Sequence, residues 1–193
     1  MNPYEQCPTF ETEHFHLRQV QLKDAADLVE CYKNPTLAVQ GSAHGCLVGP
    51  GYYGSQTKRE MRKFIRFWRM EYRKKHWYVR WSVIDRQSGV AVGTVEAGAF
   101  DIPAVGTGVG MIIDLAAPYE TEADLAELLR LSIDEFYTLF NADVFVIYGM
   151  PGADVRLNAL ADAGFIPVDW DDPDAENHYC RRRQHGAEGV IAQ

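Results

Sequence analysis

Apolar and polar residues recur along the chain with two different periods, and each change of period marks an expected element. Residues 15–20 alternate with period two, which is typical of a half-buried strand, whereas 109–115 form an almost unbroken apolar run, typical of a strand buried on both faces. Apolar residues from Leu125 to Phe140 recur every three or four positions and predict a helix with Thr121 as its N-cap. By the same criteria we expect helices at 24–34, within 58–80 and at 156–163, and strands at 77–85, 90–100, 144–148, 165–170 and 177–183.

Length and composition indicate one globular domain. The chain has 193 residues, of which 47% are hydrophobic and 24% charged, and this usage excludes a disordered or fibrous protein. No internal repeat, low-complexity tract or linker divides the sequence. We therefore expect a single domain over 1–193, with a core from about 13 to 183 and a frayed C-terminal tail.

The N-terminus and the cysteines bear on the compartment and on metal binding. The N-terminus lacks a basic region followed by an apolar run, and no stretch has the length needed to cross a bilayer, so we expect a cytoplasmic protein. The four cysteines lie far apart without a CxxC pair, which predicts neither a zinc site nor a disulfide framework. His178 and Cys180 share one face of a strand, but two ligands do not make a metal site.

The formal net charge of -8 hides an uneven distribution of charge. Residues 58–80 hold ten of the 19 basic residues and two of the 27 acidic ones. This segment is either a solvated basic face over an apolar stripe or an anion-attracting wall beside a pocket. The acidic remainder argues against general affinity for nucleic acid or an anionic membrane, and it would attract a cationic molecule at low salt.

Short motifs in a fixed order carry a family resemblance. The motifs are Phe15-His16-Leu17-Arg18 followed by Asp24-Ala25-Ala26-Asp27-Leu28, then Val92-Gly93-Thr94-Val95-Glu96, then Ala159-Leu160-Ala161-Asp162-Ala163-Gly164-Phe165. In this order the chain resembles the GNAT superfamily of N-acetyltransferases over nearly its whole length. The resemblance implies an α+β fold in which a curved, mixed sheet of about seven strands is flanked by about four helices.

The resemblance also implies an activity, the acyl-CoA-dependent transfer of an acetyl group to a primary amine by direct attack. Acetyl-CoA, the implied co-substrate, would lie in a wedge between the strands at 109–115 and 143–149, with its pantetheine arm paired to the backbone of Ile113, Leu115 and Ala116. The acceptor would be a small-molecule amine or a peptide N-terminus. The pyrophosphate would rest where the next helix begins, on Thr121, Glu122, Ala123, Asp124 and Leu125.

The segment that matches the family's pyrophosphate loop departs from the family pattern. The family reads Gln/Arg-x-x-Gly-x-Gly/Ala, whereas this chain has Ala123 and Leu125 in place of the two glycines. The carboxylates of 120, 122, 124 and 127 gain from the same helix dipole that a phosphate would use, and they would repel the phosphate. Arg156, Arg130 or the basic segment would have to compensate. The alternative function is a GNAT-like domain that has lost acetyl-CoA binding and serves as a ligand-binding or interaction module.

Acetyl transfer to an amine requires a base that keeps the amine neutral and an acid near the leaving sulfur. Glu96, late in a strand, is the first candidate base, and its plain alternative is an exposed strand residue. Asp114 interrupts an apolar run and needs a partner, so it is a base, an amine-binding group or the cap of a neighbouring turn. Tyr179 and Tyr148 are candidate acids, although aromatic residues in strands more often serve packing. His44 lies in a long loop that would border the acceptor pocket.

Overall fold

The computed structural model describes residues 2–37, 57–103, 105–171 and 176–184. Within these residues, eight strands form one sheet in the order β1-β2-β3-β4-β5-β6-β8-β7. The strands are β1 (Phe10–Glu11), β2 (Phe15–Gln19), β3 (Val79–Asp85), β4 (Ala91–Ile102), β5 (Gly106–Leu115), β6 (Val144–Tyr148), β7 (Ile166–Pro167) and β8 (His178–Arg182). The helices are α1 (Ala25–Cys31), α3 (Lys58–Lys75), α4 (Glu122–Leu139) and α5 (Asp154–Asp162), with 3₁₀ turns η1 (Leu22–Asp24) and η3 (Ala117–Tyr119).

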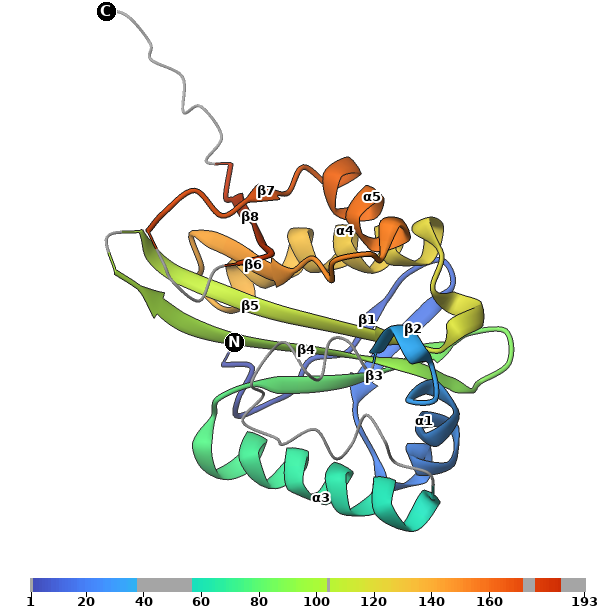
Figure 1. The fold of residues 1–193 in the computed structure, drawn as a ribbon. Helices are drawn as coiled ribbons and strands as arrows, with labels where there is room; N and C mark the ends of the chain where they lie inside the picture. The colour runs from blue at the N-terminus through green and yellow to red at the C-terminus, as the bar shows by residue number, and fades with distance from the viewer. Residues whose placement is uncertain (1, 38–56, 104, 172–175, 185–193) are drawn as a thin grey trace, which may run out of the picture.

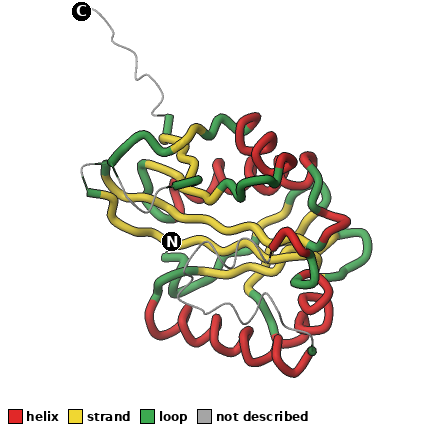
Figure 2. Tube along the Cα trace, viewed as in Figure 1, coloured by secondary structure: helices red, strands yellow, loops and turns green. Residues whose placement is uncertain are grey.

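The sheet separates two layers of helices, with α1 and α3 on one side and α4 and α5 on the other (Figure 1). A tube view coloured by secondary structure shows the same layering (Figure 2). Met61, Ile65 and Trp68 of α3 are buried with α1 in one core cluster. In the other cluster, Trp81 of β3 stacks on Phe136 of α4, with ring centroids 5.1 Å apart. Because side chains alternate along a strand, neighbouring residues of β3 and β4 enter different layers.

The strands β5 and β6 are paired over only part of their length, and this positions the candidate site. Their parallel pairing runs from Gly108 opposite Val144 to Met111 opposite Ile147. Beyond this point β5 continues to Leu115 paired with β4 alone, while the chain leaves β6 after Tyr148. The two strands therefore separate at their carboxyl ends, as the resemblance predicted.

The fold class expected from the sequence is confirmed, with differences in the element bounds. The sheet has eight strands rather than about seven, because the two-residue β1 is too short to produce a visible period in the sequence. The expected strand at 165–170 reduces to β7, and the helix expected at 24–34 is shortened to α1, which η1 precedes. Gly164 has φ of 78° after α5, as expected for a left-handed helix cap. No helix among the described residues combines the length and apolar character of a membrane span.

Candidate functional site

The first feature of the site is the edge of β5 that faces the wedge. The Ala116 amide donates to Val92 O at 2.8 Å, so this amide points into the β4–β5 ladder and away from the wedge. Backbone groups of successive residues in an antiparallel strand point to opposite sides. The backbone groups of Ile113 and Leu115 therefore face the wedge, whereas Ala116 offers it no amide.

The two wedge-facing carbonyls are already bonded to protein side chains. Arg156 of α5 donates from Nη1 to Ile113 O at 2.8 Å, and Asn34 donates from Nδ2 to Leu115 O at 2.9 Å. Both side chains belong to residues that are only 5% exposed. The two carbonyls that the pantetheine arm would use on this edge are thus satisfied within the chain.

A buried ion pair fixes Arg156 in this position. Its guanidinium donates from Nη2 to Glu120 Oε2 at 3.0 Å and from Nε to Glu120 Oε1. Asn34 Nδ2 also approaches the same carboxylate, 3.4 Å from Oε2. Glu120 and Arg156 line a cleft of about 360 Å³ together with Thr36 and residues 150–155. We call this pair the Glu120–Arg156 bridge. Its arginine is neutralised by the chain's own carboxylate.

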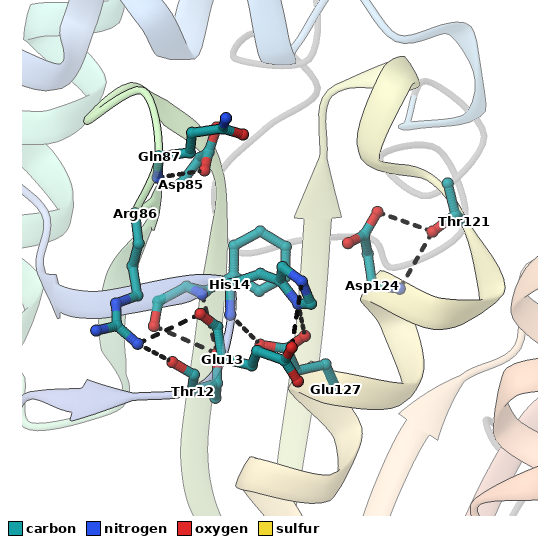
Figure 3. Close-up of polar contacts among 10 residues, drawn as sticks. Thr12, Glu13, His14, Asp85, Arg86, Gln87, Thr121, Asp124 and Glu127 are labelled. Atoms are coloured by element: carbon teal, nitrogen blue, oxygen red, sulfur yellow. Dashed lines mark hydrogen bonds and ion pairs between the residues drawn. The ribbon is translucent and has the colours of Figure 1, made fainter.

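The start of α4 is capped by its own side chains (Figure 3). Thr121 Oγ1 accepts from the Asp124 amide at 3.1 Å, and the Thr121 hydroxyl donates to Asp124 Oδ2 at 2.8 Å. Glu122 accepts from Asn158 Nδ2 at 2.8 Å. Leu125 is 3% exposed and belongs to the core, so the inward direction expected from its place in the apolar stripe is confirmed.

One turn further along α4, a carboxylate tethers the helix to the residue before β2. Glu127 accepts from the His14 amide at 2.8 Å and lies 2.7 Å from His14 Nδ1 (Figure 3). This hydrogen bond is the main reason that the pKa of the His14 imidazole is raised. The carboxylates of Glu122, Asp124 and Glu127 at this end of α4 therefore accept hydrogen bonds from other residues of the chain.

These residues do not fit a bound CoA. Its pyrophosphate would meet Glu120, Glu122 and Asp124, and an N-terminal amide that Thr121 already caps. The cations of α3 lie in the layer on the opposite side of the sheet (Figure 1). Arg130 follows the first residue of α4 by eight positions, which is about 12 Å along the helix axis. Arg156, named in the sequence as compensating charge, is held by Glu120.

The second feature is a cleft of about 310 Å³ on the α3 side of the sheet, which we call the Glu96 cleft. Glu96 of β4 lies opposite Arg80 of β3 in the ladder, and Arg80 donates to Glu96 Oε2 from Nε at 2.8 Å and also from Nη2. The Glu96 side chain is 13% exposed. Other residues that line the cleft are Trp77, Phe100, Ile112, Tyr148 and His178.

Behind Glu96, Arg80 links two carboxylates. Its Nη1 lies 3.6 Å from Asp114 Oδ2 and donates to the Tyr32 hydroxyl at 3.0 Å, which in turn donates to Asp114 Oδ2 at 2.8 Å. Thr94 Oγ1 accepts from the same Arg80 nitrogen at 3.2 Å. The guanidinium carbon lies 4.2 Å from the ring centroid of Trp68, a cation–π contact. The strand register brings these groups together, because Thr94 lies opposite Asp114 in the ladder of β4 and β5.

Burial dominates the electrostatics of this cluster. It raises the pKa of both Glu96 and Asp114, and the charge of Arg80 opposes that rise in each case. Asp114 is fully buried, and its Oδ1 atom has no hydrogen-bond partner among the described residues. Two carboxylates thus share one guanidinium. Glu96 is the one that reaches the cleft, where a carboxylate with a raised pKa can hold a cation or accept a proton.

The other candidates named from the sequence are Tyr179, Tyr148 and His44. Tyr179 pairs with Ile147 and packs on the α4 side of the sheet, with its ring against Gly149. The structure therefore brings Glu96 and Asp114 together, with Tyr148 and not Tyr179 at the cleft. His44 and the loop at 41–54 lie outside the described residues. Within the described residues, no three His, Cys, Asp or Glu side chains form a group that could hold a metal ion.

Sequence reasoning missed four polar residues that build the site: Tyr32, Asn34, Arg80 and Thr94. A signal existed for one of them. Arg80 interrupts the apolar strand Val79–Asp85 and, like Asp114, needs a partner when it is buried. Tyr32 and Asn34 follow α1 and carried no such signal.

Comparison with known proteins identifies the fold. No family model and no curated protein match the sequence. Among solved structures, RimJ of Mycobacterium smegmatis in complex with CoA-disulfide has a TM-score of 0.66 and 16% identity, covering 93% of this chain and 88% of its own. A GNAT-family acetyltransferase of Bacillus anthracis has a TM-score of 0.61 and 11% identity, with coverages of 91% and 98%. Spermidine N-acetyltransferase of Vibrio cholerae, in complex with CoA and spermine, has a TM-score of 0.59 and 13% identity, with coverages of 82% and 84%.

These likenesses extend over most of both chains, but the identities are too low to carry over a function. They agree with the resemblance inferred from the sequence. The chain has the fold of the GNAT acetyltransferases.

Proposed function

We propose that this chain is a GNAT-fold domain that does not use acetyl-CoA and that binds a small cationic ligand in the Glu96 cleft. The observation that carries the proposal is the position of Arg156. Its guanidinium is paired with Glu120 and donates to Ile113 O, on the strand edge that a pantetheine arm would use. The self-capped, acidic start of α4 supports the same conclusion for the pyrophosphate.

The charge balance of the Glu96 cleft favours a cation as its ligand. Glu96 and Asp114 share the single guanidinium of Arg80, so the cluster carries one excess negative charge when both carboxylates are ionised. Both Arg80 contacts with Glu96 fall on Oε2, which leaves Oε1 for a ligand. The aromatic walls of Trp77, Phe100 and Tyr148 suit the apolar part of an amine. A solved protein of this fold is complexed with spermine, itself an amine.

A second candidate function is acyl-CoA-dependent N-acyltransfer to an amine, the leading expectation from the sequence. The observation that favours it is the separation of β5 and β6 beside a buried carboxylate with a raised pKa. Solved neighbours of this fold are complexed with CoA. The two candidates agree on an amine at Glu96, and they differ on whether the wedge accepts a cofactor.

The amine site is tested by thermal unfolding in the presence of a panel of amines, including spermine. A ligand at about 100 times its dissociation constant stabilises the folded state by about 2.7 kcal/mol, which corresponds to a rise in Tm of roughly 5–10 °C. We expect at least one amine to produce a saturable rise in wild type and the rise to disappear in Glu96→Gln, each protein being compared with its own unliganded Tm.

Glu135→Gln is the matched control, because Glu135 is exposed on α4 in the opposite layer. This variant should keep the full ligand-induced shift. An amine-induced shift of the same size in Glu96→Gln would show that the ligand binds elsewhere, and no shift with any amine would remove the support for a cationic ligand.

A further inference from the structure

The surface of α3 carries an unusual line of like charges. Nine of its 18 residues are Lys or Arg. Arg62, Arg66, Arg69 and Arg73 recur at spacings of three and four, so they follow one side of the helix over about 16 Å. Arg66, Arg73 and Lys74 are exposed. Like charges at this spacing repel one another and destabilise a helix.

The described part of the chain does not compensate this charge. Within α3 an ion pair joins Lys75 to Glu71 at 3.4 Å, and among the described residues no ion pair reaches Arg66, Arg69, Arg73 or Lys74. The segment that precedes α3 in the sequence, residues 38–56, contains no Asp or Glu. Neither the described residues nor residues 38–56 therefore supply an acidic partner for these four cations.

The charged side of α3 is also hollowed. A groove of about 410 Å³ lies between α3 and η1, lined by Leu22, Arg66, Arg69, Met70, Arg73 and Lys74. Arg73 also borders a neighbouring hollow that extends toward Arg18 and His76. Two apolar side chains line the groove between these cations: Leu22, which is partly buried, and Met70, which is 37% exposed. We call this surface the α3 groove.

The charge of the remaining chain restricts the kind of polyanion that fits. Outside 58–80 the sequence has 25 acidic and nine basic residues. A nucleic-acid duplex about 20 Å wide would press its phosphates against this acidic surface, where like charges within a Debye length of about 10 Å repel. An extended polypeptide is narrow enough to meet the groove alone, and five residues at about 3.3 Å each span its length.

We propose that the α3 groove binds an acidic segment of another polypeptide. Three alternate side chains on one face of an extended segment span about 14 Å, and Arg66, Arg69 and Arg73 span about 10 Å along α3, a difference that the long arginine side chains can bridge. Carboxylates on that face reach Arg66, Arg69 and Arg73, and the methylene groups of the same acidic side chains contact Leu22 and Met70. The groove lies apart from the Glu96 cleft, so this proposal does not depend on the proposed function.

Fluorescence anisotropy with a labelled peptide of about twelve glutamates tests the proposal, with an oligothymidylate of the same length as the competing probe. We expect salt-sensitive binding of the peptide by wild type and weaker binding of the oligonucleotide. The triple variant Arg66→Gln/Arg69→Gln/Arg73→Gln should bind the peptide about tenfold more weakly. Lys33→Gln/Arg130→Gln/Arg182→Gln, which removes three exposed charges elsewhere, should bind like wild type.

Each other result overturns the proposal. Equal loss of binding in the two triple variants would indicate a response to net charge alone, and tighter binding of oligothymidylate would indicate a nucleic-acid surface. Absence of peptide binding at about 50 mM salt would exclude the groove as an acidic-segment site. If the groove variant unfolds, the salt series of wild type decides, because peptide binding by this surface must weaken steeply as salt rises.

Discussion

Arg80→Met is expected to lower the free energy of unfolding by about 3–5 kcal/mol, a fall in Tm on the order of 10 °C. Arg80 is 2% exposed and is the cation shared by Glu96 and Asp114. Removing it leaves two buried carboxylates without a counter-charge and takes a donor from the Tyr32 hydroxyl. Chemical denaturation monitored by circular dichroism measures the loss.

The loss should depend on pH with a definite sign. Burial already raises the pKa of Glu96 and Asp114, and removing Arg80 raises both pKa values further. A carboxyl whose folded-state pKa lies above its unfolded value stabilises the fold below the unfolded pKa, and this stabilisation is lost as pH rises through the folded pKa. The gap between wild type and Arg80→Met should therefore be smaller at pH 5 than at pH 8.

Arg130→Met provides the control for the Arg80 prediction, since Arg130 is exposed on α4. It should change stability by no more than about 0.5 kcal/mol at either pH. A loss in Arg80→Met below about 1 kcal/mol, or one equal at both pH values, would contradict the charge network that supports the Glu96 cleft.

The second large effect is expected at the Glu120–Arg156 bridge. Arg156→Met removes the donors to Glu120 and to Ile113 O. It should lower the free energy of unfolding by about 3 kcal/mol, since it leaves the largely buried Glu120 carboxylate without its counter-charge. Glu120→Gln should cost about 1–2 kcal/mol. In the double variant the two losses should not add, and a coupling of about 1–3 kcal/mol is expected from the cycle.

Asp169 and Arg182 form a matched exposed pair at 2.9 Å, with side chains 47% and 53% exposed. The cycle of Asp169→Asn and Arg182→Met should give a coupling below about 1 kcal/mol. A coupling at the Glu120–Arg156 bridge no larger than this control would mean that the bridge does not hold the wedge edge closed.

The sequence predicted most of the fold because the period of a strand or helix is a local property. The buried run at 109–115, the stripe on α4 and the cap at Thr121 all follow from near neighbours in the chain. The bridge could not be predicted, because Glu120 and Arg156 meet only when α5 packs beside α4. For the same reason Arg80 could not be predicted as the partner of Glu96, because their pairing depends on the register of β3 and β4.

The proposed function requires that the wedge does not accept acetyl-CoA, and calorimetric titration of acetyl-CoA into the wild-type protein measures this binding. We predict no saturable heat up to about 1 mM, and no rise in Tm at that concentration, where a ligand with a dissociation constant of about 10 μM would add about 2.7 kcal/mol. A saturable heat with a matching rise in Tm would contradict the claim and restore acyl transfer as the function.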